Sequence, residues 1–243
     1  MSAARPDARP PAAASPAALG EASRFLRRVL RRPSHGDYRL LAHVRPSPGQ
    51  VFVDAGAYDG DAVEAMRLYH PDTPIHAFEP NPRRALRLAH RFAEDPALCV
   101  YRCGLSNQEC EAVLAAPLRG GRLVEGRASF DARQAARWSQ VRWLETKVFP
   151  LDALDLDVSV LKVAVNGLER AVLEGAEATL KGCEPLVICA VDAAADAFLT
   201  GTLGWMRARF DGARLIPGET GSRHAVYAGP AGEAALWRAG LLA

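Results

Sequence analysis

The hydrophobic pattern of this chain alternates between short apolar runs and longer segments with helical spacing. Runs rich in β-favouring residues over residues 51–54, 74–79 and 98–103 predict three strands. Between them, residues 61–69 and 83–93 carry apolar side chains every three or four positions, which is typical of amphipathic helices. Strand and helix units that repeat every ~20 to 25 residues predict parallel strands joined by right-handed crossovers.

Residues 107–150 interrupt this alternation. They contain two predicted strands and one predicted helix, over residues 111–115, 145–149 and 131–138. The segment is an insertion that either shapes a substrate pocket or covers a sheet edge. The alternation then resumes with a strand over residues 158–165, a helix over residues 168–180 and a strand over residues 185–191.

The last third of the chain predicts a helix over residues 202–210 and two strands over residues 213–216 and 225–228. A Gly-rich turn between the two strands predicts a hairpin, and therefore an antiparallel strand at the sheet edge. The expected fold is α/β, with a mostly parallel seven-stranded sheet, an antiparallel edge strand and helices on both faces.

The N-terminal region has a different composition. Residues 1–20 are rich in Ala and Pro with almost no large apolar side chains, which predicts a disordered tail. Residues 21–49 hold two short predicted helices, over residues 21–32 and 35–44. Because 243 residues can bury one sizeable core, we expect residues 21–243 to form a single domain.

Composition narrows the possible partners. The net charge is +2 and the 30 basic residues are scattered along the chain, so no nucleic-acid footprint is expected. No apolar run approaches the ~20 residues needed to span a bilayer, and the N-terminus lacks the apolar core of a signal peptide. Five cysteines, an odd number without zinc-ligand spacing, predict neither a disulfide framework nor a metal site. We therefore expect a soluble cytoplasmic protein.

The first candidate ligand-binding residues lie where the first predicted strand ends. Asp54 is followed by Gly56 and Gly60, a strand, loop and helix in which backbone N–H groups can approach a ligand. Glu79 ends the second strand, and acids at the carboxyl ends of neighbouring parallel strands reach the same crevice. A carboxylate can accept hydrogen bonds from two hydroxyl groups at once, which makes Glu79 the candidate for a ribose diol.

The spacing of the glycines excludes two common nucleotide sites. A dinucleotide loop requires G-x-G-x-x-G, whereas here the bulky Tyr58 lies midway between Gly56 and Gly60. A phosphate-binding G-x-x-x-x-G-K-[ST] is also absent. What remains is D-x-G-x-x-x-G, close to the first motif of class I S-adenosylmethionine-dependent methyltransferases, where the loop passes near the methionine moiety.

The chain resembles the FkbM-type methyltransferase family over residues 50–192. The motifs that carry the resemblance are VDAGAYDG at residues 53–60, AFEPNP at 77–82, GLS at 104–106, PLDAL at 150–154, LKVAVNGLE at 161–169 and VLEGA at 172–176. The resemblance implies a Rossmann-like class I methyltransferase fold, S-adenosylmethionine as cofactor, and methylation of a hydroxyl on a sugar or secondary metabolite. The cofactor-binding residues that it implies are Asp54, Gly56, Tyr58, Gly60, Glu79, Asn81, Gly104 and Leu105.

The chain departs from the family pattern where the acceptor is expected. The late motif usually reads Lys-hydrophobic-Asp-hydrophobic-Glu-Gly, but Ala164 and Asn166 replace both acids. The next strand commonly ends in Glu where this chain has Ala190, although Asp192 follows two residues later. Such losses remove candidate general bases, so the sequence supports cofactor binding better than catalysis.

The remaining catalytic candidates are Asn166, Asp192 and Lys162, with Glu169 as a further possible base. Each has a structural alternative: Asn166 turns the chain, Asp192 caps the next helix, and Glu169 lies on a solvated helix face, which we favour for Glu169. Lys162, in an apolar strand, must face a carboxylate or the site, because an unpaired buried ammonium is costly.

Two hypotheses of different classes follow. The first is an O-methyltransferase of a small hydroxylated acceptor. The second is a degenerate family member that acts through binding or protein contacts, suggested by Ala164, Asn166 and Ala190. A nucleic-acid methyltransferase is disfavoured, because no Asn-Pro-Pro-Tyr motif and no basic patch with interleaved aromatic residues is present. Oligomeric state is not encoded in any recognisable pattern.

Overall fold

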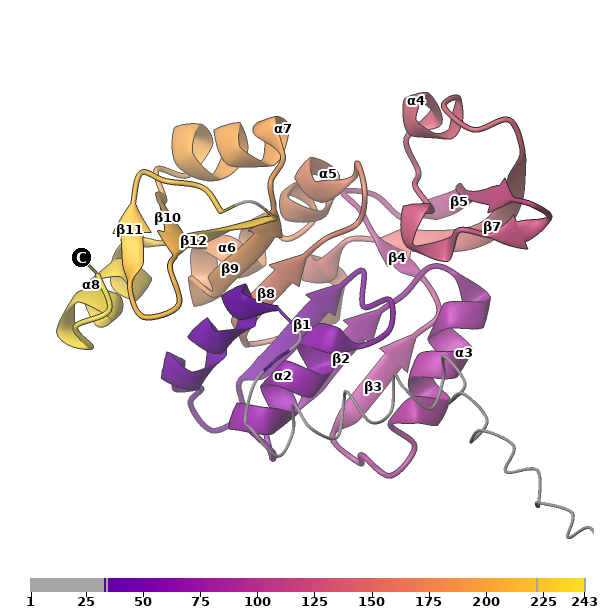
Figure 1. Cartoon of the computed structure of the whole chain (residues 1–243). Helices are drawn as coiled ribbons and strands as arrows, with labels where there is room; N and C mark the ends of the chain where they lie inside the picture. The colour runs from indigo at the N-terminus through magenta and orange to yellow at the C-terminus, as the bar shows by residue number, and fades with distance from the viewer. Residues whose placement is uncertain (1–32, 34, 222, 243) are drawn as a thin grey trace, which may run out of the picture.

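The computed structural model describes residue 33, residues 35–221 and residues 223–242. The expectations for residues 1–20 and 21–32 lie outside the described residues. Within the described part, the chain forms a large sheet with helices on both faces and a second, smaller sheet (Figure 1).

The main sheet has eight strands, and the carboxyl ends of its parallel strands form the edge where the site lies. The strands are β1 (Val51–Ala55), β2 (Ile75–Phe78), β3 (Leu98–Tyr101), β8 (Val158–Val163), β9 (Leu186–Ala190), β10 (Met206–Phe210), β11 (Leu215–Pro217) and β12 (His224–Ala228). Their spatial order is β11-β10-β12-β9-β8-β1-β2-β3. The strands from β3 to β9 pair in parallel, whereas β12, β10 and β11 pair antiparallel.

The segment predicted as an insertion builds the second sheet. Its strands are β4 (Gly104–Leu105), β5 (Cys110–Arg119), β6 (Arg122–Leu123) and β7 (Val141–Phe149), in the order β4-β7-β5-β6. A short 3-10 helix η2 (Glu125–Arg127) and helix α4 (Ala132–Ala135) connect them. Figure 1 shows this unit at one corner of the main sheet.

Helices cover both faces of the main sheet. They are η1 (Gly36–His43), α2 (Asp61–Tyr69), α3 (Pro82–Arg91), η3 (Leu151–Leu154), α5 (Glu169–Glu174), α6 (Glu177–Cys183), α7 (Ala193–Asp196), the π-helix η4 (Ala197–Thr202) and α8 (Pro230–Arg238). Helices α2 and α3 lie on one face, and α5 and α6 lie on the other (Figure 1).

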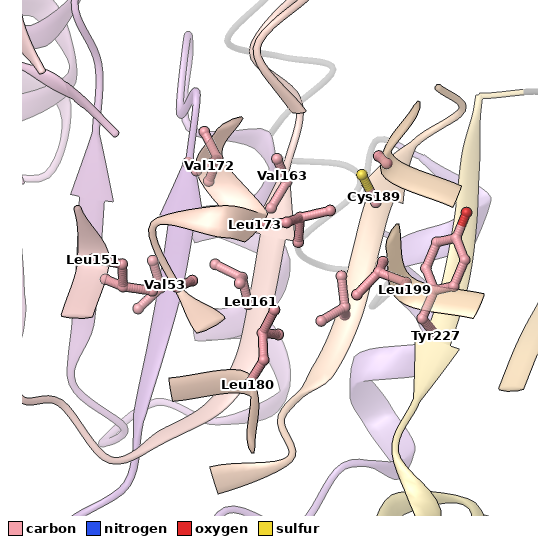
Figure 2. Packing of buried hydrophobic residues seen from close by; sticks show 14 of the residues in the cluster. Val53, Leu151, Leu161, Val163, Val172, Leu173, Leu180, Cys189, Leu199 and Tyr227 are labelled. Atoms are coloured by element: carbon pink, nitrogen blue, oxygen red, sulfur yellow. The ribbon is translucent and has the colours of Figure 1, made fainter. Parts of the chain in front are cut away.

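The core follows from the two-residue period of the strands. In β1, Val51 and Val53 pack toward α5 and α6, whereas Phe52 packs toward η1 and α2. Val172 and Leu173 of α5 close the first of these clusters over the sheet, as Figure 2 shows. Each fully buried aliphatic or aromatic side chain stabilises the fold by about 1.5 to 3 kcal/mol relative to an exposed one. The apolar clusters on the two faces therefore hold the strands, and with them the strand ends, in place.

The predicted fold class is confirmed: the sheet is mostly parallel, helices flank it on both faces, and antiparallel strands form one edge. The strand number is eight, not seven, because the short β11 extends that edge. The predicted helix over residues 202–210 is wrong, since Met206–Phe210 is strand β10. The predicted hairpin is wrong as well, because β10 lies between β11 and β12.

The burial pattern of β10 explains why this segment is a strand and not a helix. Ala208 and Phe210 are buried, while Arg207 and Arg209 point to the other side and form ion pairs with Asp196 and Glu219. This period of two is the strand signal, and it is only five residues long. On α3, Leu86 is exposed although it is apolar, and the packing positions are Ala85 and Leu88.

The predicted helix over residues 168–180 is divided into α5 and α6. Gly175 lies at the break, and a Cβ atom at this position would lie 1.9 Å from the carbonyl oxygen of Ser106. Backbone therefore packs directly on backbone where the helix passes the loop that follows β4.

We expect Gly175→Ala to lower the free energy of unfolding by about 2 kcal/mol, because backbone must shift to accept one methyl group. The matched control is Gly182→Ala in α6, where nothing lies within 4 Å of an added Cβ atom. That variant should gain about 0.5 to 1 kcal/mol from helix propensity. Urea denaturation of both variants measures the difference; equal stabilities would contradict the backbone contact.

Candidate functional site

A cavity of about 370 Å³ lies at the carboxyl edge of the main sheet. Gly56, which follows β1, and Ala164, which follows β8, both line it. Strand order reverses here, because the chain runs from β1 outward to β3 and later returns to β8 on the other side of β1. Such a switch point is the usual ligand site of an open α/β sheet, and the volume suits a small molecule.

Two glycines allow the loop after β1 to fold tightly. Gly56 has a φ of +81°, and a Cβ atom there would lie 2.1 Å from the carbonyl oxygen of Ala164. Gly60 has a φ of +82°, and its Cβ atom would lie 2.5 Å from a methyl group of Leu88. Any other residue would be strained at both positions, so the glycines hold the loop against β8 and α3.

The N–H groups of this loop are used within the protein. Gly56 and Ala57 donate to the carbonyl oxygen of Phe78 at 2.9 and 3.0 Å, and Tyr58 donates to Oε2 of Glu79 at 2.8 Å. The expectation that loop N–H groups approach a ligand is therefore wrong for these three residues. The loop is instead fastened to the end of β2.

Glu79 is the carboxylate that faces the cavity. It is only 6% exposed, and its Oε1 accepts a second backbone hydrogen bond, from the N–H of Asn81 at 2.9 Å. Burial raises the pKa of Glu79, while the hydrogen bonds from Asn81 and Tyr58 lower it. Each oxygen keeps a further lone pair, so Glu79 is an oriented acceptor for two hydroxyl groups.

A buried ion pair lies beneath the loop. The ammonium of Lys162 is 2.8 Å from Oδ1 of the fully buried Asp54, and it donates to the carbonyl oxygen of Gly56 at 2.7 Å. Burial acts to lower the pKa of Lys162, but the attraction of Asp54 outweighs it and the pKa is raised. Lys162 faces a carboxylate, as expected, and also lines the cavity; Asp54 does not line it.

The turn after β8 is held by another buried carboxylate. Glu169 accepts hydrogen bonds from the N–H groups of Val165 at 3.0 Å and Gly167 at 2.8 Å. It is 5% exposed, so the favoured interpretation of a solvated helix face is wrong. Asn166 sits in this turn with a φ of +55°, lines the cavity, and donates from Nδ2 to the carbonyl oxygen of Ala128 at 3.0 Å.

Other candidates lie outside the cavity wall. Asp192 caps α7 by accepting from the N–H of Ala195 at 2.8 Å, and Asn81 caps α3 by accepting from Arg83 at 3.1 Å. Gly104 and Leu105 are buried in β4. These residues, together with Gly60, shape the elements around the cavity instead of lining it.

Part of the wall was not anticipated from the sequence. His35, Tyr38, Arg223 and His224 line one part of the cavity, brought together from η1 and β12. The ring centroids of Tyr38 and His224 are 5.6 Å apart, as are those of Tyr38 and His35. Burial raises the pKa of Tyr38 to about 12, so its hydroxyl is neutral at physiological pH.

The insertion also contributes to the wall. Leu114, Gly126, Ala128 and Phe130 line the cavity, which supports the pocket-shaping interpretation of residues 107–150. Among the described residues, no group of three or more His, Cys, Asp or Glu side chains is placed to hold a metal ion. No helix in that part of the chain has the length and apolar character to cross a membrane.

Comparisons with known proteins indicate a family and a fold for this chain. Residues 54–210 match the model of a family described as the methyltransferase FkbM domain. Among solved structures, methyltransferase FkbM from Methylobacillus flagellatus KT is similar at 16% identity and a TM-score of 0.51. The likeness covers 79% of this chain and 47% of the other, so the chain spans about half the length of that relative.

Two more solved structures have lower TM-scores. One is a precorrin-6y C5,15-methyltransferase from Geobacter metallireducens GS-15, at 15% identity and a TM-score of 0.42, covering 77% of this chain and 83% of that one. The other is an rRNA methylase from Streptococcus thermophilus, at 12% identity and 0.42, covering 81% and 95%. A comparison with curated protein sequences gave no match.

The buried ion pair between Lys162 and Asp54 should contribute strongly to the stability of the protein. Lys162→Met leaves the Asp54 carboxylate buried without its counter-charge, so we expect the free energy of unfolding to fall by about 3 to 5 kcal/mol. The double variant Asp54→Leu/Lys162→Met should recover at least half of this loss, because no buried charge remains. Chemical denaturation of the three proteins gives the comparison.

The matched control is Lys181→Met, which removes the exposed ion pair with Glu177. Its effect should stay below ~1 kcal/mol, because exposed pairs contribute little. A loss for Lys162→Met as small as that for Lys181→Met would refute the structural role of the buried pair.

Proposed function

The chain belongs to the FkbM methyltransferase family, and on this premise we propose that it transfers a methyl group from S-adenosylmethionine to a hydroxyl oxygen of a small acceptor. The sequence resemblance to this family is confirmed, and the fold is that of class I methyltransferases. The acceptor is a sugar or a secondary metabolite. The observation that carries the proposal is Glu79, an oriented, nearly buried carboxylate in the wall of the switch-point cavity.

The residues present fit the proposed cofactor. Glu79 would accept hydrogen bonds from the two ribose hydroxyls, since both carboxylate oxygens retain a lone pair after binding backbone N–H groups. The ring of Tyr58 and the side chain of Phe130 offer apolar surface for the base. Gly56 brings the loop backbone close to the ligand.

The other residues of the expected cofactor set would act from behind the wall. Asp54 holds Lys162, which in turn fixes the carbonyl group of Gly56. Gly60 and Asn81 set the starts of α2 and α3. Gly104 and Leu105 belong to β4, which pairs with β7 of the insertion. Their contribution to binding is therefore the shape of the site.

When bound, S-adenosylmethionine supplies a methyl group on a positively charged sulfur. The protein contributes position, because a displacement of this kind depends on holding the acceptor oxygen close to and in line with the methyl carbon. Asn166 can help, since its Nδ2 is bound to Ala128 while its Oδ1 accepts no hydrogen bond from a described residue and can orient a hydroxyl. Leu114 and Phe130 add apolar surface to the cavity wall, which favours the release of water when a ligand binds.

We expect the protein to bind S-adenosylhomocysteine in a calorimetric titration. Glu79→Ala should weaken this binding at least ~100-fold, because two hydrogen bonds to a charged acceptor are lost at about 1.5 to 3 kcal/mol each. The matched control is Glu94→Ala, which removes an exposed carboxylate elsewhere on the surface and should leave the affinity unchanged. Absence of binding to the unmutated protein would overturn the proposed cofactor.

A product screen tests the acceptor class. Incubation with S-adenosylmethionine and a panel of methyl glycosides and hydroxylated aromatic compounds should yield methyl ethers, detected by mass spectrometry as a gain of one methylene mass. Products methylated on nitrogen or carbon would contradict O-methylation. Any turnover rejects the alternative of a degenerate, binding-only protein, which is suggested by the missing carboxylates at Ala164 and Ala190.

A further inference from the structure

The part of the cavity wall made by η1 and β12 contains the only two histidines among its described lining residues, His35 and His224. Their ring centroids are 6.4 Å apart, with the ring of Tyr38 within 5.6 Å of each. Neither histidine belongs to the motifs that carry the family resemblance. Imidazoles are the side chains best suited to move protons near neutral pH.

His224 has the geometry of an oriented base. Its Nδ1 is 2.9 Å from Oδ2 of Asp37, which lies in the first turn of η1. Because a carboxylate only accepts hydrogen bonds, the proton of a neutral imidazole must be on Nδ1, and the lone pair must be on Nε2. No described residue forms a hydrogen bond with Nε2. The side chain is about 9% exposed and His224 is the first residue of β12, where it pairs with Ala190 of β9, so it is held firmly.

His35 is not equivalent. Its Nε2 lies 3.6 Å from Oδ2 of Asp61, and its Nδ1 lies 3.4 Å from the guanidinium of Arg223. Both ring nitrogens of His35 therefore already face a charged neighbour. Of these two histidines, only His224 has a ring nitrogen without a hydrogen-bond or ion-pair partner among the described residues.

The other ionisable groups of the wall are occupied. Glu79 binds two backbone N–H groups and, in the proposed function, the ribose hydroxyls; Lys162 binds Asp54 and Asp59 is paired with Arg84. The remaining carboxylate of the wall, Asp61, lies 3.6 Å from Nε2 of His35. The hydroxyl of Tyr38 holds its proton up to a pKa of about 12. This leaves His224 as the available proton acceptor of the cavity.

The position of His224 in the sheet is also informative. β12 runs antiparallel to β9, so its first residue, His224, pairs with Ala190, the last residue of β9. An amino-terminal strand end thus lies at the same edge as the carboxyl ends of the parallel strands. His224 brings an ionisable side chain to the point of that edge where Ala190 carries none.

We propose that His224 is the general base of this enzyme and that Asp37 is its positioning residue, an inference that rests on the proposed methyltransferase function. The O–H bond of the acceptor breaks and its proton passes to Nε2 of His224. The acceptor oxygen forms its bond to the methyl carbon as the bond between that carbon and the positively charged sulfur breaks. The sulfur becomes a neutral thioether, and the positive charge resides on the imidazolium beside Asp37.

The first test needs no acceptor. Nitrogen-15 NMR of the histidine rings, in protein saturated with S-adenosylhomocysteine, should show neutral His224 with its proton on Nδ1. Asp37→Asn should abolish this preference, because the amide can donate to Nδ1. A neutral ring with its proton on Nε2 in the unmutated protein would overturn the proposal, since that nitrogen could not accept the acceptor's proton.

The second test uses an acceptor found in the product screen. His224→Gln should lower kcat at least ~100-fold and remove the acidic limb of its pH profile, while the KM for S-adenosylmethionine changes by less than about threefold. The groups whose charge also bears on this profile are Asp37, His35, Tyr38, Arg223 and Asp61. The matched control, His90→Gln on the exposed surface of α3, should retain full activity.

Asp37→Asn serves as a second variant if His224→Gln does not fold, and it should lower kcat at least ~10-fold. A kcat within threefold of the unmutated value for a folded His224→Gln variant would refute the base. The two proposals fail differently: loss of the proposed function removes S-adenosylhomocysteine binding from the unmutated protein, whereas loss of this inference leaves that binding intact.

Discussion

The site depends on one buried ion pair, between Asp54 on β1 and Lys162 on β8. These strands are neighbours at the point where the order of the sheet reverses, and the pair joins them beneath the glycine loop. Two charges in an apolar core are tolerable only together, because either one alone would carry a large desolvation cost. The pair also fixes the carbonyl group of Gly56, so the register of two strands and the path of the loop are linked.

Two further carboxylates hold the loops on either side of this pair. Glu79 accepts from the N–H groups of Tyr58 and Asn81, and Glu169 accepts from those of Val165 and Gly167. Each acid satisfies two backbone donors that would otherwise be unpaired at a strand end. The difference between them is orientation: Glu79 faces the cavity, whereas Glu169 lies behind its wall. Acids near strand ends can therefore face a cavity or support a loop behind its wall, and burial alone does not distinguish the two positions.

Much of the architecture was predictable because the signals are local. The apolar run of β1, the glycines of the loop and the helical spacing of α2 lie within twenty consecutive residues. The same holds for Glu79 at the end of β2. By contrast, β10 shows its period of two over only five residues, which is too short to separate a strand from a helix by sequence. Because residues 206–210 were predicted as part of a helix, the sequence did not indicate that β12 lies between β10 and β9.

The sequence by itself determined the parallel core, the glycine loop after β1 and the position of Glu79 at the end of β2, since strand period and glycine spacing are properties of neighbouring residues. Only the tertiary structure decided that Lys162 pairs with Asp54, that Glu169 is a support, and that His224 meets Asp37 across 187 positions of the chain. The physical reason is that side-chain partners are set by strand order and by packing between distant elements, which no local pattern records.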